Sequence, residues 1–169
     1  TVMNAHYIES VKSVNKIADI LGEKPYRDVE KMKEVFFRNF YDYDNHRFFD
    51  SNETTHSSLV SNLFCYGYEL CPDTEFEDCT LKLLRERKIS AVSLFTTFVA
   101  LEGLVRRGLW KDLEECLLDE GAWLRILREG GTTTFEGWGK DTKWNTSLFH
   151  LTMSYAAIFM ADIDLNKLF

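Results

Sequence analysis

The sequence predicts an all-α protein made of helical hairpins arranged as a toroid. Apolar residues recur at helical spacing along most of the 169 residues, and the chain has only two prolines and nine glycines. Segments that are apolar on nearly every side alternate with segments that carry one apolar stripe. A helix with one stripe faces solvent on its back, whereas a helix that is apolar all round is enclosed. The alternation therefore predicts inner helices surrounded by outer ones, and the lack of a fixed sequence period disfavours a repeat array.

The apolar spacing predicts about seven helices in chain order. Gly22 is expected to end the first, and Pro25 suits the first turn of the second. The third, fifth and last helices are the ones expected in the inner layer. The predicted helices cover residues 2–21, 25–40, 55–70, 74–87, 91–109, 111–119 and 147–163, with a short outer segment at 123–127.

Residues 41–51, "YDYDNHRFFDS", separate the second and third predicted helices. Asp44 and Asn45 favour a turn, and the flanking aromatic residues indicate a small hairpin or extended loop. The stretch from Asp42 to Asp44 is similar to the start of a calcium-binding loop. The glycine and the distal glutamate of that motif are missing, so we interpret the stretch as a turn.

Composition limits the classes of partner. Hydrophobic residues make up 45% of the chain, enough for a sizeable core, and the formal net charge is −7. An acidic surface disfavours nucleic acid and anionic lipid as partners. The most apolar stretch, residues 148–163, is shorter than the ~20 residues that cross a bilayer, so we expect no membrane span.

The cysteines show no metal-binding pattern. The four cysteines stand at positions 65, 71, 79 and 116, without CxxC spacing and away from the four histidines. We therefore expect buried reduced thiols, no metal and no cofactor. Free thiols fit a reducing compartment such as the cytoplasm.

Residues 130–150, "GGTTTFEGWGKDTKWNTSLFH", form the candidate site. The flanking glycines let the backbone pass close to a ligand, and the threonines favour an extended approach. A carboxylate among aromatic faces can accept a proton from water as a general base, and those faces can contact the C–H surface of a sugar. The candidate residues are Glu136 as the catalytic group and Phe135, Trp138, Trp144 and His150 as substrate-binding groups.

A plainer interpretation of the same residues stays open. Glu136 can be a solvated loop acid, the tryptophans can be core residues, and His150 can be a polar residue at the start of a helix. One acid in a loop does not decide between the two interpretations.

A resemblance to a known family favours catalysis. "REGGTTTFEGW", followed by "SLFH" and an apolar helix, resembles the "GATTxWE-W … SLNH" signature of α-L-rhamnosidase-type glycoside hydrolases, whose fold is a six-hairpin (α/α)6 barrel. The upstream stretches "VSNLFCYGY", "SLFTTFVALEGLVRRGLW" and "EGAWLRILREGG" are similar to the order of barrel helices in that family. The likeness covers residues 5–163.

The resemblance implies roles for three positions. Glu136 matches the general base of this inverting family, His150 matches a histidine that contacts the sugar in the −1 site, and Trp138 matches an aromatic wall of the pocket. Phe135 replaces a tryptophan of the signature and Phe149 replaces an asparagine, which weakens the assignment of rhamnose as the substrate.

Glycoside hydrolysis needs a second carboxylate, and the family's general acid comes from the amino-terminal half of the barrel. No stretch of this chain resembles that acidic region. We therefore expect residues 1–169 to form one partial domain, the carboxy-terminal half of the barrel, with little or no hydrolase activity by itself. Exposed inner helices would lead to self-association or to pairing with the missing half. The alternative is a non-catalytic helical module that binds sugar or protein.

Overall fold

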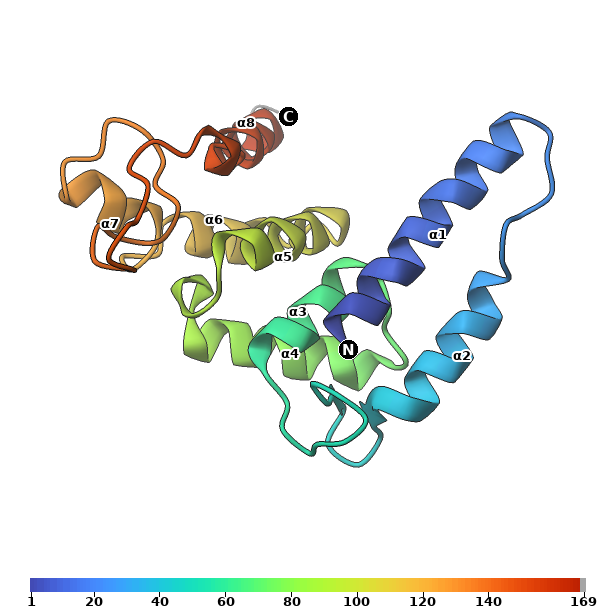
Figure 1. The fold of residues 1–169 in the computed structure, drawn as a ribbon. Helices are drawn as coiled ribbons and strands as arrows, with labels where there is room; N and C mark the ends of the chain where they lie inside the picture. Colours follow the sequence, from blue (N-terminus) through green and yellow to red (C-terminus); the bar gives the residue numbers. More distant parts are fainter. Residues whose placement is uncertain (168–169) are drawn as a thin grey trace. The chain divides into compact units, whose positions relative to one another are not determined.

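The computed structural model describes the backbone of residues 1–167 and the side chains of residues 1–161. It divides into two compact units, Thr1–Lys82 and Leu83–Phe169, and each is described by itself (Figure 1). Helices dominate both units, and the described strands form one short hairpin, which confirms the all-α class.

Unit 1 is built from a helical hairpin, a β-hairpin and a third helix. α1 and α2 lie side by side, and α1 also packs on α3 (Figure 1). α1 is followed by Gly22, whose φ of 70° suits a residue without a Cβ. The elements are α1 (Val2–Ile20), α2 (Val29–Phe40), β1 (Tyr41–Asp42), β2 (Arg47–Phe48) and α3 (Leu59–Gly67), followed by α4 (Thr74–Arg87), which runs into unit 2.

The start of α2 differs from the prediction. Pro25 does not occupy its first turn, because the helix begins after Asp28, whose carboxylate accepts a hydrogen bond of 3.1 Å from the Lys31 amide. The residues before Asp28 are held instead by Asn15, whose side chain accepts from the Tyr26 amide (2.8 Å) and donates to the Arg27 carbonyl (2.8 Å). A side-chain contact from α1 thus holds residues 26 and 27 outside α2.

The β-hairpin confirms the turn prediction. Tyr41 pairs with Phe48 and Asp42 pairs with Arg47. The Asp42 carboxylate accepts from the backbone amides of Asp44 and Asn45, both at 3.2 Å, so this carboxylate closes the turn.

An aromatic cluster forms the centre of unit 1. Phe48 is fully buried, and its ring lies 5.2 Å from that of Phe36, 4.9 Å from Tyr41 and 5.1 Å from Phe76. These rings come from α2, both strands and α4. Phe48 therefore packs the hairpin against α2 and α4.

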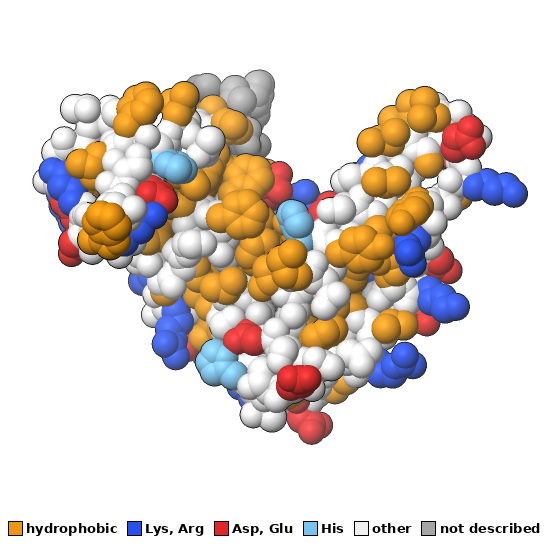
Figure 2. Space-filling view, viewed as in Figure 1, with side chains coloured by type: hydrophobic (Ala, Val, Ile, Leu, Met, Phe, Trp, Pro, Cys, Tyr) orange, Lys and Arg blue, Asp and Glu red, His pale blue; other side chains and the backbone are white. Residues whose placement is uncertain are grey.

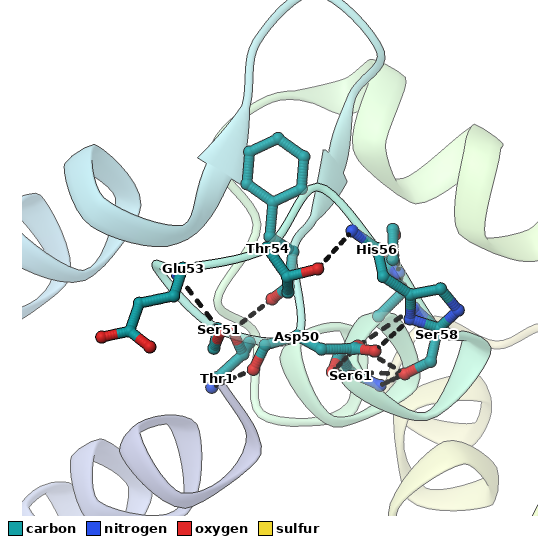
Figure 3. A network of polar contacts seen from close by, with 11 residues as sticks. Thr1, Asp50, Ser51, Glu53, Thr54, His56, Ser58 and Ser61 are labelled. Carbon is teal, nitrogen blue, oxygen red and sulfur yellow. Dashed lines mark hydrogen bonds and ion pairs between the residues drawn. The ribbon is translucent and has the colours of Figure 1, made fainter.

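Asp50 organises the loop that leads into α3 (Figure 3). Its carboxylate accepts from the Ser58 hydroxyl (2.6 Å), the Ser58 amide (3.0 Å), the Ser61 hydroxyl (2.6 Å) and His56 Nδ1 (2.5 Å). Burial raises the pKa of Asp50, but the hydrogen bonds from Ser58, Ser61 and His56 outweigh that effect and hold the pKa well below its usual range. The predicted third helix therefore begins at residue 59 rather than 55.

Unit 2 contains η1 (Ile89–Ala91), α5 (Leu94–Arg106), α6 (Trp110–Leu117), α7 (Trp123–Arg128), η2 (Leu151–Met153) and α8 (Ala156–Lys167). α6 packs on α5 and on α8. Arg85 on α4 makes two hydrogen bonds to Asp112 on α6, at 2.6 and 2.9 Å. The Arg85 side chain is half-exposed and that of Asp112 is nearly buried. Their two-point ion pair joins α4 to α6.

The prediction of the last helix is wrong for its first residues, 147–150. These residues form neither helix nor strand, and the helix proper starts at Ala156. α8 also exposes Ile158 and Met160, so its described part is not enclosed as predicted, whereas α3 and α5 are buried on most sides.

The cysteines are all free thiols. Cys65 and Cys116 are buried as predicted, and burial raises the pKa of Cys116 to about 12. Cys71 is partly buried and Cys79 is exposed, which contradicts the prediction for Cys79. Among the described residues, no helix combines the length and the apolar character of a membrane span.

Replacing Asp50 by asparagine should lower the free energy of unfolding by about 1–3 kcal/mol at pH 7, because several charge-assisted hydrogen bonds lose their acceptor charge. Because the folded-state pKa is depressed, the wild-type stabilisation is complete above the unfolded pKa of about 3.9 and is lost as the pH falls below it. Urea unfolding at pH 7 and pH 3 measures both effects.

Asp44→Asn, at an exposed turn position, is the matched control and should change the free energy of unfolding by less than about 0.5 kcal/mol. A difference between wild type and Asp50→Asn that stays the same at pH 3 as at pH 7 would contradict the role given to the carboxylate.

Candidate active site

Two non-helical segments of unit 2 are joined by hydrogen bonds and carry the predicted site residues. His150 donates its amide to the Thr134 carbonyl (2.8 Å), and Glu136 donates its amide to the Ser147 carbonyl (2.9 Å). The Thr134 hydroxyl adds a bond to the His150 carbonyl (2.7 Å), and the Thr133 hydroxyl adds one to the Leu148 carbonyl (3.1 Å). The threonines thus fix the register between residues 133–136 and 147–150 and bring Glu136 and His150 to the same pair of segments.

Glu136 is held by both of its carboxylate oxygens. Oε1 accepts from the Lys143 ammonium at 2.5 Å, and Oε2 accepts from the Ser147 amide at 3.1 Å. The hydrogen bond from Lys143, then that from Ser147, hold the pKa of Glu136 below its ordinary value, and the charge of His150 acts in the same direction. The lowered pKa keeps the carboxylate ionised at neutral pH. The side chain is 31% exposed, so solvent can reach it.

Phe135 and Trp138, next to Glu136 in the chain, are both buried. Phe135 is 2% exposed. Trp138 donates its indole N–H to the Val92 carbonyl at 2.6 Å, and its ring meets the ring of Trp123 edge-on at 4.9 Å. Both rings are packed against protein and support the backbone that carries Glu136.

Trp144 and His150 have different surroundings. Trp144 lies in the loop before Ser147, and its side chain is 95% exposed. His150 is half-buried and precedes η2. The structure therefore places Glu136 and His150 on the same pair of segments, buries Phe135 and Trp138, and leaves the Trp144 ring in solvent.

A glycine is required where the site segment leaves α7. A Cβ on Gly131 would lie 2.7 Å from Ile126 Cγ2 and 3.0 Å from Phe135 Cζ, closer than side chains ordinarily approach. The absence of a Cβ allows the backbone to turn closely over α7 before the threonines.

A cluster of charges that sequence reasoning missed anchors the loop after Trp138. Arg125 on α7 pairs with Glu129 at 2.7 Å and also with Asp141, and the Glu129 carboxylate accepts from the Lys140 amide at 2.7 Å. The four-residue spacing of Arg125 and Glu129 on a helix signals their own pair, but their contacts with residues 140 and 141 follow from the fold.

A cavity of about 450 Å³ lies beside the threonines of the site. It is bounded by α7, η2 and α8, and the indole N–H of Trp123, which lines it, is buried without a hydrogen-bond partner. Its volume falls in the range of ligand pockets. The sequence did not reveal it, because its walls come from segments far apart in the chain. The lining comprises Leu117, Trp123, Ile126, Leu127, Gly131, Thr132, Thr133, Thr134, Leu151, Ser154, Ala156 and Met160.

Comparison with known proteins agrees with the all-α fold. A family model described as the bacterial alpha-L-rhamnosidase 6 hairpin glycosidase domain matches residues 1–162, and the chain belongs to this family. No curated protein and no solved structure matches the chain.

Proposed function

We propose that this domain serves an inverting glycosidase that hydrolyses terminal α-linked L-rhamnose or a related deoxysugar, with Glu136 as the general base. The observation that carries the proposal is the state of the Glu136 carboxylate, which is partly exposed and has a lowered pKa. Membership of the rhamnosidase family supports a carbohydrate substrate.

The lowered pKa supports the role of base rather than acid. A general acid must keep its proton near neutral pH and needs a raised pKa, whereas a base must be ionised. Lys143 and the Ser147 amide favour the ionised form of Glu136. In an inverting reaction the carboxylate accepts a proton from water, the water oxygen bonds to the anomeric carbon, and the glycosidic bond breaks as an acid protonates the leaving oxygen.

The other site residues are proposed to hold the sugar. His150 would hydrogen-bond a hydroxyl group, and the exposed indole of Trp144 would cover a C–H face of the ring. Phe135 and Trp138, which are only 2% and 8% exposed, would support the pocket from within the core rather than contact the sugar directly.

We propose further that the general acid lies outside this chain, about 6.5–9.5 Å from Glu136 in the complete site. The support is the resemblance, which assigns the acid to a region that no stretch of this chain resembles. The isolated chain should then release little or no phenol from aryl α-L-rhamnosides, whose leaving oxygen needs a proton.

A substrate that needs no acid tests the role of Glu136 in the chain as it is. α-L-Rhamnosyl fluoride loses fluoride without protonation of an alkoxide, so the base alone should support its hydrolysis. We expect fluoride release that falls about 10²–10⁴-fold in Glu136→Gln, with β-L-rhamnose as the first product by NMR.

Glu120→Gln is the control, because Glu120 is also a turn carboxylate paired with a cation, Arg128, and lies outside both site segments. It should retain fluoride release. Equal rates for wild type and Glu136→Gln would overturn the catalytic assignment. Release from aryl α-L-rhamnosides that disappears in Glu136→Gln would overturn the proposed absence of an acid.

Two observations favour a second candidate, a sugar-binding module without catalysis. The Lys143 ammonium lies 2.5 Å from Glu136 and weakens its basicity, and Phe149 stands where the family signature has an asparagine. Binding of L-rhamnose without hydrolysis of the fluoride would support this candidate.

We also propose that the chain self-associates. Figure 2 shows hydrophobic side chains exposed along the hairpin of α1 and α2, and Met3, Ile17 and Ile20 are 78%, 57% and 82% exposed. On α5, Phe95 is 58% exposed. Burying such surfaces against a second copy is favourable.

Light scattering should show a mass above that of one chain, and the mass should fall in Ile17→Lys, which places a charge on the exposed face of α1. Lys16→Glu, on a neighbouring position, is the control and should leave the mass unchanged. A single-chain mass for wild type at every concentration would contradict self-association.

A further inference from the structure

We propose that His46, Asp73 and Glu75 form a binding site for a divalent transition-metal ion, with zinc as the best match. The site lies within unit 1 and is separate from the residues assigned to glycoside hydrolysis. The ligand atoms of the three side chains all lie within 4.8 Å of one another. They come from the β-hairpin and from the start of α4, two segments that fold against each other through the buried aromatic cluster.

The spacing of the first two ligand atoms suits one ion. His46 Nδ1 and Asp73 Oδ2 are 3.2 Å apart. Zinc bonds of about 2.0–2.2 Å at angles between octahedral and tetrahedral hold two ligand atoms roughly 3.0–3.5 Å apart. An ion beside the line between these two atoms can therefore bind both after small adjustments of the two side chains.

Asp73 is already fixed in place. The Tyr41 hydroxyl donates to both of its carboxylate oxygens at 2.9 Å, and the Phe76 amide donates to Oδ1 at 2.7 Å. Tyr41 is 6% exposed, so its hydroxyl is directed by a buried ring. Such outer contacts orient ligands in metal sites, and they lower the cost of ordering Asp73 when an ion binds.

The third ligand and the access route favour a site open to solvent. Glu75 is exposed, and the side chains of His46 and Asp73 are 34% and 24% exposed. One imidazole nitrogen and two carboxylates match the ligand types of zinc sites that keep a fourth position for water. The imidazole disfavours calcium and magnesium, which prefer oxygen ligands throughout.

A second histidine–aspartate pair offers a natural comparison. His56 Nδ1 lies 2.5 Å from Asp50 Oδ2, but the other groups on that carboxylate are the serines at 58 and 61 rather than a second acid (Figure 3). The pair of His56 and Asp50 therefore has the same imidazole–carboxylate contact but no counterpart of Glu75. The proposal therefore predicts tight metal binding at one pair and not at the other.

Isothermal titration of the metal-free chain with zinc chloride tests the site. We expect one equivalent to bind, with affinity reduced at least about tenfold in His46→Ala and in Glu75→Gln, and unchanged in His56→Ala. Zinc should also raise the unfolding temperature of wild type more than that of Glu75→Gln. Asp73 is left intact, because it also accepts the Phe76 amide at the start of α4.

Cobalt(II) distinguishes this site from cysteine ligands, since Cys79 is exposed. Visible d–d bands without a thiolate-to-cobalt charge-transfer band support the imidazole and carboxylate ligands. A thiolate band, no zinc binding, or equal affinity in wild type and His46→Ala would each overturn the proposal.

Discussion

The candidate site depends on the pairing of residues 133–136 with residues 147–150. The two backbone bonds and the two threonine hydroxyls set the register, and that register delivers the Ser147 amide to Glu136 Oε2. Lys143, in the loop between the segments, reaches the other oxygen. Without this pairing the carboxylate would be an ordinary solvated side chain. With it, the carboxylate has a lowered pKa, a fixed orientation and an open face.

The sequence predicted the fold best where local signals agree. Apolar spacing and helix-starting residues gave α4 with its observed bounds, and Asp44 with Asn45 gave the hairpin. It predicted less well where a distant contact competes with local preference. Asn15 binds residues before α2, and Asp50 binds residues before α3. The threonines at 133 and 134 bind residues 148 and 150, which were predicted to be helical. Helix propensity cannot detect such partners, because it does not include side-chain contacts made from outside the segment.

The candidate site was predicted from a short motif. Gly131, the threonines and Glu136 resemble part of the family signature, and the family match over residues 1–162 confirms the recognition of the family. The roles of Lys143 and Ser147 could not be predicted, because they depend on the path by which the loop after Trp138 folds back to Glu136. The cluster of His46, Asp73 and Glu75 was hidden for the same reason, since a turn residue meets the start of a helix 27 positions later. Both cases show side chains that acquire their chemistry from tertiary contacts.

The central claim is that the fold keeps Glu136 ionised, and a direct measurement of its pKa tests it. The account predicts that the Glu136 carboxyl carbon, followed by NMR titration, changes protonation below the ordinary glutamate value of about 4.3, and that Lys143→Met moves the midpoint upward. A midpoint at or above that value, unaffected by Lys143→Met, would contradict the account.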